Sequence, residues 1–83
     1  MKRKLYLKTI YENDGGFLHR EDGPAIEHIT GRKEYFLNGM RHRVDGPAVI
    51  DASGGKSWYW KGLHVSEDEY KKKSLKNNLM DLI

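Results

Sequence analysis

The chain has 83 residues, no cysteine, a formal net charge of +3 and 37% hydrophobic residues. This length suits one small domain that buries only about 60–65% of its unfolded surface, and the lack of cysteine excludes a disulfide framework or a thiolate metal site. No apolar run approaches the roughly 20 residues that cross a bilayer, so we expect a soluble, cytoplasmic protein.

The excess positive charge lies near the N-terminus. Lys2, Arg3, Lys4 and Lys8 precede the first acid, whereas acids and bases nearly balance over the rest of the chain. A basic strip attracts polyanions, and nucleic acid is the commonest of them. The alternative is that these side chains only keep a small protein in solution.

The N-terminal segment 1–15 is predicted to be one strand followed by a turn. Lys4–Tyr11 alternates in part between the two faces of an extended chain, which indicates a strand that pairs with the segment after it. The run Glu12-Asn13-Asp14-Gly15-Gly16 is rich in turn-forming residues.

The central part of the chain is an internal repeat. The pattern His-Arg-x-Asp-Gly-Pro-Ala begins at His19 and again at His42, and the same interval relates Gly39 to Gly62 further on. So many matches in one register, with Gly and Pro among them, indicate a repeated structural unit. The boundaries are 16–38 for the first repeat, 39–61 for the second and 62–65 for a partial third.

Each repeat is predicted to form strand, turn, strand, turn. Asp-Gly-Pro favours a turn, and Pro drives the residue before it into extended geometry. Ala25–Ile29 and Lys33–Leu37 are the strands of the first repeat, and Asn38-Gly39 closes it with a strong hairpin signal. We therefore predict a mainly β protein in which tandem β-hairpin repeats form an antiparallel sheet.

Residues 66–83 are predicted to form a C-terminal helix that caps this sheet. Ser66 and Glu69 have the spacing of a capping box, and the acids of the first turn suit the helix dipole. Asn77-Asn78 would end or fray the helix. As an alternative to capping, the last apolar side chains would contact a second copy of the protein. These candidate interface residues are Leu79, Leu82 and Ile83, which together with Leu75 share one helical face.

No catalytic, metal or cofactor site is predicted. The histidines lack a paired spacing on a helix, and His19 and His42 occupy equivalent repeat positions. We expect these two rings to bond a backbone carbonyl or the turn aspartate. Asp22 and Asp45 have backbone roles in their turns, and no set of nucleophile, base and orienting residue is visible. We therefore expect a protein that is not an enzyme.

Aromatic and basic side chains are the candidates for nucleic-acid binding. In so small a chain most aromatics are expected in the core, but one or two exposed beside Lys or Arg would stack on unpaired bases. The lysine run 71–73 is either a solvated helix face or a phosphate-binding surface. The candidate RNA-binding residues are Lys2, Arg3, Lys4, Arg32, Lys33, Lys56, Lys71, Lys72, Lys73, Tyr35, Trp58 and Trp60.

The repeated pattern, His-Arg-x-Asp-Gly-Pro-Ala followed by Gly-x-Lys-x-aromatic-aromatic, resembles the variant MORN-like repeats of small phage, viral and bacterial proteins, including the YwqK-type antitoxin-like proteins. The resemblance covers residues 16–64. It implies a β-hairpin repeat sheet that is used for binding and not for catalysis. Short basic proteins with such repeats resemble phage accessory or counter-defence factors.

These observations predict a non-enzymatic, antitoxin-like binding protein that binds RNA and neutralises a toxin or a host nuclease. The alternative is a protein–protein interaction module without nucleic-acid binding. A homodimer is also expected, because a short repeat array leaves an open sheet edge that a second chain can pair or cover.

Overall fold

The computed structural model describes residues 1–81, and it describes side chains for residues 1–75. In chain order the elements are β1 (Lys2–Lys4), β2 (Lys8–Tyr11), β3 (Ile26–His28), β4 (Lys33–Glu34), β5 (Phe36–Leu37), β6 (Met40–Arg41), β7 (Val49–Ile50), β8 (Lys56–Trp60), β9 (Leu63–Val65) and α1 (Glu67–Asp81).

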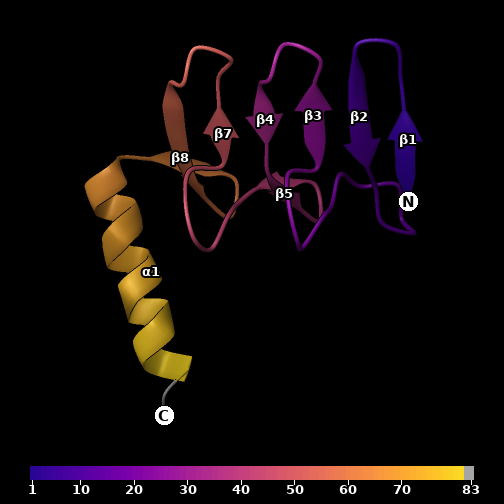
Figure 1. Ribbon diagram of the computed structural model, residues 1–83. Coiled ribbons are helices and arrows are strands. Elements are labelled where there is room, and N and C mark those ends of the chain that lie inside the picture. The colour runs from indigo at the N-terminus through magenta and orange to yellow at the C-terminus, as the bar shows by residue number, and fades with distance from the viewer. Residues whose placement is uncertain (82–83) are drawn as a thin grey trace.

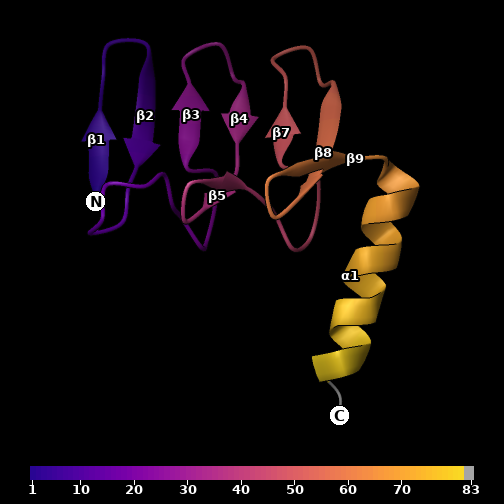
Figure 2. The same cartoon turned by 180° about the vertical axis from the view of Figure 1, so that it is seen from behind.

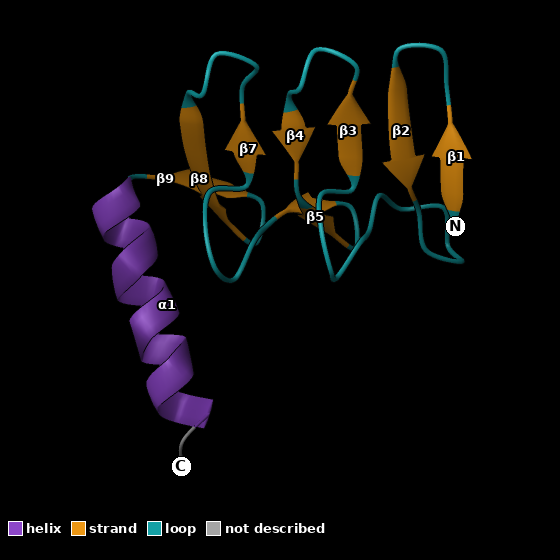
Figure 3. Cartoon of the chain, viewed as in Figure 1, coloured by secondary structure: helices purple, strands orange, loops and turns teal. Residues whose placement is uncertain are grey.

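Three hairpins stand side by side in a seven-stranded sheet, β1–β2, β3–β4 and β7–β8 (Figure 1). The strand order is β1-β2-β3-β4-β7-β8-β9, and every neighbouring pair is antiparallel. Strands β5 and β6 pair separately. Figure 3 separates the strands from the single helix that follows them. The prediction of a mainly β protein with tandem hairpins and a C-terminal helix is confirmed.

The two repeats make the same backbone hydrogen bonds. The N–H of Tyr11 donates to the C=O of Ala25 at 2.8 Å, and one repeat later the N–H of Tyr35 donates to Ala48 at 2.7 Å. Both alanines follow the proline of the turn and are fully buried. Each hairpin is therefore joined to the next by an equivalent hydrogen bond, and a buried alanine lies at each of these contacts.

The N-terminal segment differs from its prediction, since it is a complete hairpin and not one strand. The N–H of Leu5 donates to the C=O of Lys8 at 2.7 Å and closes a turn over residues 5–7 between β1 and β2. The turn contains no Gly, Asn or Pro, and it was therefore predicted as part of a strand. The predicted pairing with the first repeat is confirmed, because Ile10 of β2 pairs with Ile26 of β3.

The core is a narrow apolar row on one side of the sheet. One cross-strand row on β2, β3, β4 and β7 consists of four buried residues, which are Ile10, Ile26, Glu34 and Val49 in that order. No large side chain in the described part of the chain is fully buried. A sheet this thin depends on contacts between adjacent repeats for its stability.

Helix α1 begins at the predicted cap and leaves the sheet at its β8–β9 end, opposite the N-terminal hairpin (Figures 1 and 2). The hydroxyl of Ser66 accepts the N–H of Glu69 at 3.1 Å. The predicted end of the helix at Asn77-Asn78 is wrong, because the helix continues to Asp81. Asparagine costs a helix only about 0.7 kcal/mol. Within the described residues, no helix is long and apolar enough to span a bilayer.

Candidate functional site

The arginine of each repeat is held in place by its own Asp-Gly-Pro turn. Nε of Arg43 lies 3.1 Å from Oδ1 of Asp45, and Nη1 donates to the C=O of Pro47 at 3.2 Å. Its guanidinium carbon lies 4.0 Å from the centre of the Tyr35 ring. A Cβ at Gly46 would lie 3.0 Å from the guanidinium carbon. The motif therefore builds a compact turn in which glycine leaves room for the arginine.

The first repeat reproduces this turn. Arg20 bonds Asp22 at 3.1 Å and the C=O of Pro24 at 3.2 Å, and it lies 4.0 Å from the centre of the Tyr11 ring. The carboxylates of Asp22 and Asp45 therefore hold the arginine of their own repeat, and the predicted bonds to backbone groups are replaced by bonds to a side chain.

The repeated histidines support the hairpin turns through a different group from the one expected. Nδ1 of His19 accepts the N–H of Asn38 at 2.9 Å, and Nδ1 of His42 accepts the N–H of Lys61 at 2.9 Å. Asn38 and Lys61 have φ values of 50° and 49°. The structure thus corrects the partner of Nδ1 from a carbonyl or a carboxylate to a backbone amide. Burial, and then the charge of Lys61, lower the pKa of His42, which keeps its ring neutral and able to accept.

All five arginines of the chain form ion pairs. The pairs are Arg3–Glu12, Arg20–Asp22, Arg20–Glu27, Arg32–Glu34, Arg32–Asp51, Arg41–Glu34 and Arg43–Asp45. The candidate RNA-binding residues Arg3 and Arg32 are thus both matched by acids. An electropositive surface on this protein depends on its lysines.

Glu34 is the centre of the largest of these ionic clusters. It is only 6% exposed. Its carboxylate lies 2.8 Å from Nε2 of His28, 2.9 Å from Nη2 of Arg41 and 3.5 Å from Nε of Arg32. Burial alone would raise the pKa of Glu34, but the hydrogen bonds from His28 and Arg41 and the two arginine charges outweigh it and lower the pKa. The cluster ties β3, β4 and β6 together.

Three of the candidate lysines share one face of the sheet. Lys4, Lys33 and Lys56 are exposed and belong to one cross-strand row on β1, β4 and β8. Strands lie about 4.8 Å apart, so neighbouring lysines of the row are separated by roughly 10–15 Å. Glu27 occupies the same row beside Lys33. The row is basic but interrupted by an acid.

The other candidate lysines lie at the two ends of the molecule. Lys2 is exposed on the outermost strand, β1, two residues before Lys4 and therefore on the same face. On α1, Lys71 pairs with Glu67 at 3.4 Å, Lys72 is exposed and Lys73 is partly buried. The structure therefore does not gather the predicted basic residues into one continuous patch.

The predicted stacking residues are half-buried, and each packs against another side chain. Tyr35 lies under Arg43, and the Trp58 ring centre is 4.9 Å from that of Tyr70. Trp60 contacts the edge of His42, with ring centres 4.8 Å apart. The three aromatics pack the repeats and the helix together, but the core position expected for most aromatics is found for Tyr70 alone among the described residues. The candidate interface residues Leu79, Leu82 and Ile83 lie outside the described side chains.

Sequence reasoning missed an apolar surface formed by the residue that follows the glycine of each hairpin turn. Phe17, Met40 and Leu63 occupy equivalent positions and are 58%, 46% and 63% exposed. A Cβ at Gly39 would lie 3.1 Å from Cδ1 of Phe17, and one at Gly62 would lie 3.6 Å from Cβ of Met40. Phe17 and Met40 therefore each pack on the turn of the next repeat. We call these three residues the apolar ridge; their shared place after Gly in each repeat was the available signal.

The described residues contain no group of three or more His, Cys, Asp or Glu side chains that could hold a metal ion. Comparisons with protein-family models, curated proteins and solved structures find no match to this chain.

Proposed function

We propose that this chain is a non-enzymatic binding protein that docks on another protein through the apolar ridge. The partner class that the repeat resemblance implies is a toxin or a nuclease, which the protein would neutralise by occupying its surface. The observation that carries this proposal is the exposure of Phe17, Met40 and Leu63 at one repeated position.

Protein-binding surfaces place exposed apolar side chains together and surround them with polar groups. The ridge meets this description, because its three members follow one another along the repeats and Phe17 and Met40 each pack on the next turn. Consecutive repeats fix the spacing of these side chains. A rigid surface loses little conformational entropy when it binds.

RNA binding is the second candidate, and the exposed row of Lys4, Lys33 and Lys56 favours it. Lysines spaced by roughly 10–15 Å would contact separate phosphates of a strand laid across the hairpins. All five arginines form ion pairs, and the candidate aromatic rings pack against other side chains. Both features reduce the number of groups that remain for this role. We therefore rank protein docking first.

Site-specific photo-crosslinking in native host cells tests the docking proposal. A photoreactive amino acid at Met40 of the ridge is compared with one at Thr30, an exposed position in the loop between β3 and β4. We expect a discrete protein adduct from Met40 that survives ribonuclease, little from Thr30, and loss of the adduct when Leu63→Asp is added. Equal labelling at both positions would contradict the proposal.

A filter-binding titration with generic single-stranded RNA at two salt concentrations tests the second candidate. If the lysine row binds phosphates, affinity falls steeply with salt and falls further when Lys4, Lys33 and Lys56 are changed to glutamate. Absence of binding at low salt would remove RNA from the proposal and leave protein docking. Binding that is unchanged in the triple variant would remove the lysine row as its site.

A further inference from the structure

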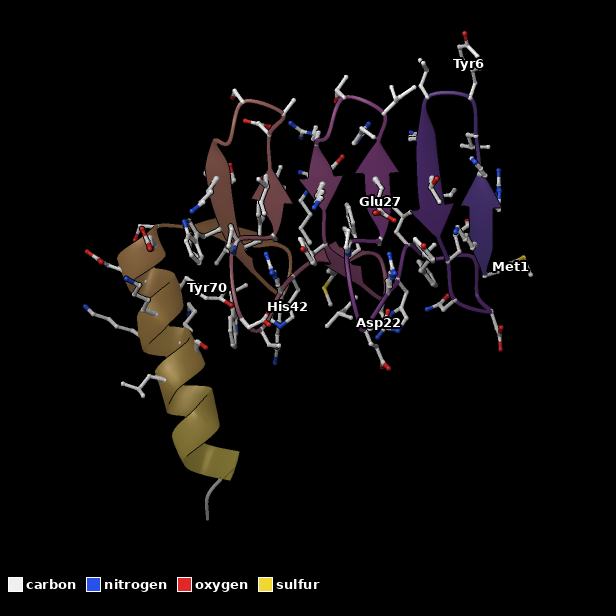
Figure 4. All side chains as sticks on the ribbon, in the orientation of Figure 1. Met1, Tyr6, Asp22, Glu27, His42 and Tyr70 are labelled. Carbon is white, nitrogen blue, oxygen red and sulfur yellow. The ribbon has the colours of Figure 1, made fainter. Side chains whose placement is uncertain are left out.

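Tyr70 shows how the second repeat holds an aromatic hydroxyl group. The side chain is 4% exposed, and its ring centre lies 4.9 Å from that of Trp58 and 5.8 Å from that of Trp60. The hydroxyl accepts the N–H of Gly46 at 3.0 Å and donates to the C=O of Arg43. Figure 4 shows Tyr70 pointing from α1 toward the turn that follows His42. The turn therefore offers one donor and one acceptor to a phenol.

The first repeat has the same groups beside a cavity. Tyr70 is surrounded by Gly46, Arg43, Trp58 and Trp60. The equivalent positions one repeat earlier are Gly23, Arg20, Tyr35 and Leu37, in the same order. These four residues line a cavity of about 240 Å³, which the second turn closes on its other side with His42 and Arg43. The cavity lies between the two Asp-Gly-Pro turns.

Two backbone groups at the cavity have no hydrogen-bond partner among the described residues. Among the residues that the structure describes, no group donates to the C=O of Arg20 or accepts the N–H of Gly23, although the counterparts of both are bonded by Tyr70. Arg43 covers the face of Tyr35 here, and its own polar contacts go to Asp45 and Pro47. The first repeat thus retains a donor and an acceptor that its own chain does not use.

We infer that this cavity, the inter-turn cavity, receives a tyrosine side chain from the protein partner, and this inference rests on the proposed docking function. The partner's hydroxyl accepts the N–H of Gly23 and donates to the C=O of Arg20, as Tyr70 does one repeat later. The cavity is smaller than the roughly 300–1,000 Å³ of small-molecule sites, which favours a side chain over a cofactor.

The chemistry of the lining selects a neutral hydroxyl group. A carboxylate cannot donate to the Arg20 carbonyl. An ammonium group cannot accept the N–H of Gly23. A phenylalanine ring would leave both backbone groups without a partner. Tyrosine supplies an apolar ring beside Leu37 and both hydrogen-bonding functions.

A titration of the unmodified, isotope-labelled protein with N-acetyltyrosinamide, followed by the backbone amide signals, tests the inference. We expect a saturable downfield shift of the Gly23 amide and little change at Gly46, whose amide is already bonded to Tyr70. N-acetylphenylalaninamide is the matched probe without the hydroxyl. It should bind about tenfold more weakly, because two hydrogen bonds are lost.

Equal shifts from both probes, or no saturable shift at Gly23, would overturn the tyrosine assignment. This outcome is distinct from failure of the docking proposal, because the probes do not need the apolar ridge. Crosslinking from Met40 can succeed while the titration fails, in which case the partner binds without a tyrosine in the inter-turn cavity.

Discussion

Replacing Tyr70 with phenylalanine tests how the helix is attached to the repeats. The change removes the hydroxyl and leaves the ring against Trp58. The buried N–H of Gly46 and the C=O of Arg43 then lose their partner. A buried polar group left unsatisfied costs about 1–3 kcal/mol, so we expect the free energy of unfolding to fall by about 2 kcal/mol. For a domain of this size that corresponds to a melting temperature roughly 10 °C lower.

Urea unfolding followed by tryptophan fluorescence measures this loss. Trp58 and Trp60 are the two tryptophans of the chain, and both lie beside Tyr70. Tyr6→Phe is the matched control, because Tyr6 is 94% exposed in the first hairpin turn. We expect the control to unfold like the natural protein. If Tyr70→Phe were also within about 0.3 kcal/mol of the natural protein, the reasoning about the hydroxyl would be refuted.

The stability of the same variant should depend less on alkaline pH than that of the natural protein. Burial raises the pKa of Tyr70, and this effect exceeds the opposing effects of the Gly46 hydrogen bond and the Arg43 charge. A raised pKa in the folded state means that the stability from Tyr70 is present below the unfolded pKa of about 10 and is lost as pH rises through the folded value. The alkaline fall in melting temperature should therefore be smaller in Tyr70→Phe than in the natural protein.

Three other outcomes are expected. His42→Asn should lower the free energy of unfolding by about 1 kcal/mol at pH 7, because the Lys61 amide loses its acceptor. Since the pKa of His42 is lowered in the folded state, the natural protein should lose stability as pH falls below about 6.5. Thermal melts measure both effects, and His64→Asn at an exposed position is the control. Glu34→Ala should destabilise the protein by about 3 kcal/mol in urea unfolding, because it leaves the surrounding cations uncompensated, and an unchanged midpoint would remove the buried cluster from the stability argument. Sedimentation should give a homodimer at high protein concentration, whereas a strict monomer would reject self-association. A weaker dimer in Met40→Ser would place the contact on the apolar ridge.

Local patterns predicted most of the hairpins because turn chemistry acts over a few neighbouring residues. Asp-Gly-Pro and Asn-Gly form turns whatever surrounds them, and Ser66 caps the helix through a bond to Glu69 within one turn. The first hairpin was not predicted, since the turn at residues 5–7 has no such signal. There the pairing of Ile10 with Ile26 on the neighbouring repeat is what places the strands.

The charge of the candidate surface could not be predicted in the same way. Sequence composition shows an excess of bases, but it does not show that Arg32 of the first repeat pairs with Asp51 of the second. The apolar ridge could not be predicted either, because its exposure also depends on contacts between repeats. A residue after a turn glycine is exposed or buried according to what the next repeat places over it, and Phe17 lies over Gly39 while remaining 58% exposed.

The amino-acid sequence by itself determined a repeated hairpin unit with a capped helix at its end, because both depend on bonds between residues close together in the chain. Only the tertiary structure decided which groups remain free for binding. In the fold every arginine is matched with an acid, and the candidate aromatic rings pack against other side chains. It leaves exposed an apolar ridge and a pair of unsatisfied backbone groups between the turns, because the helix supplies a tyrosine to the second repeat alone.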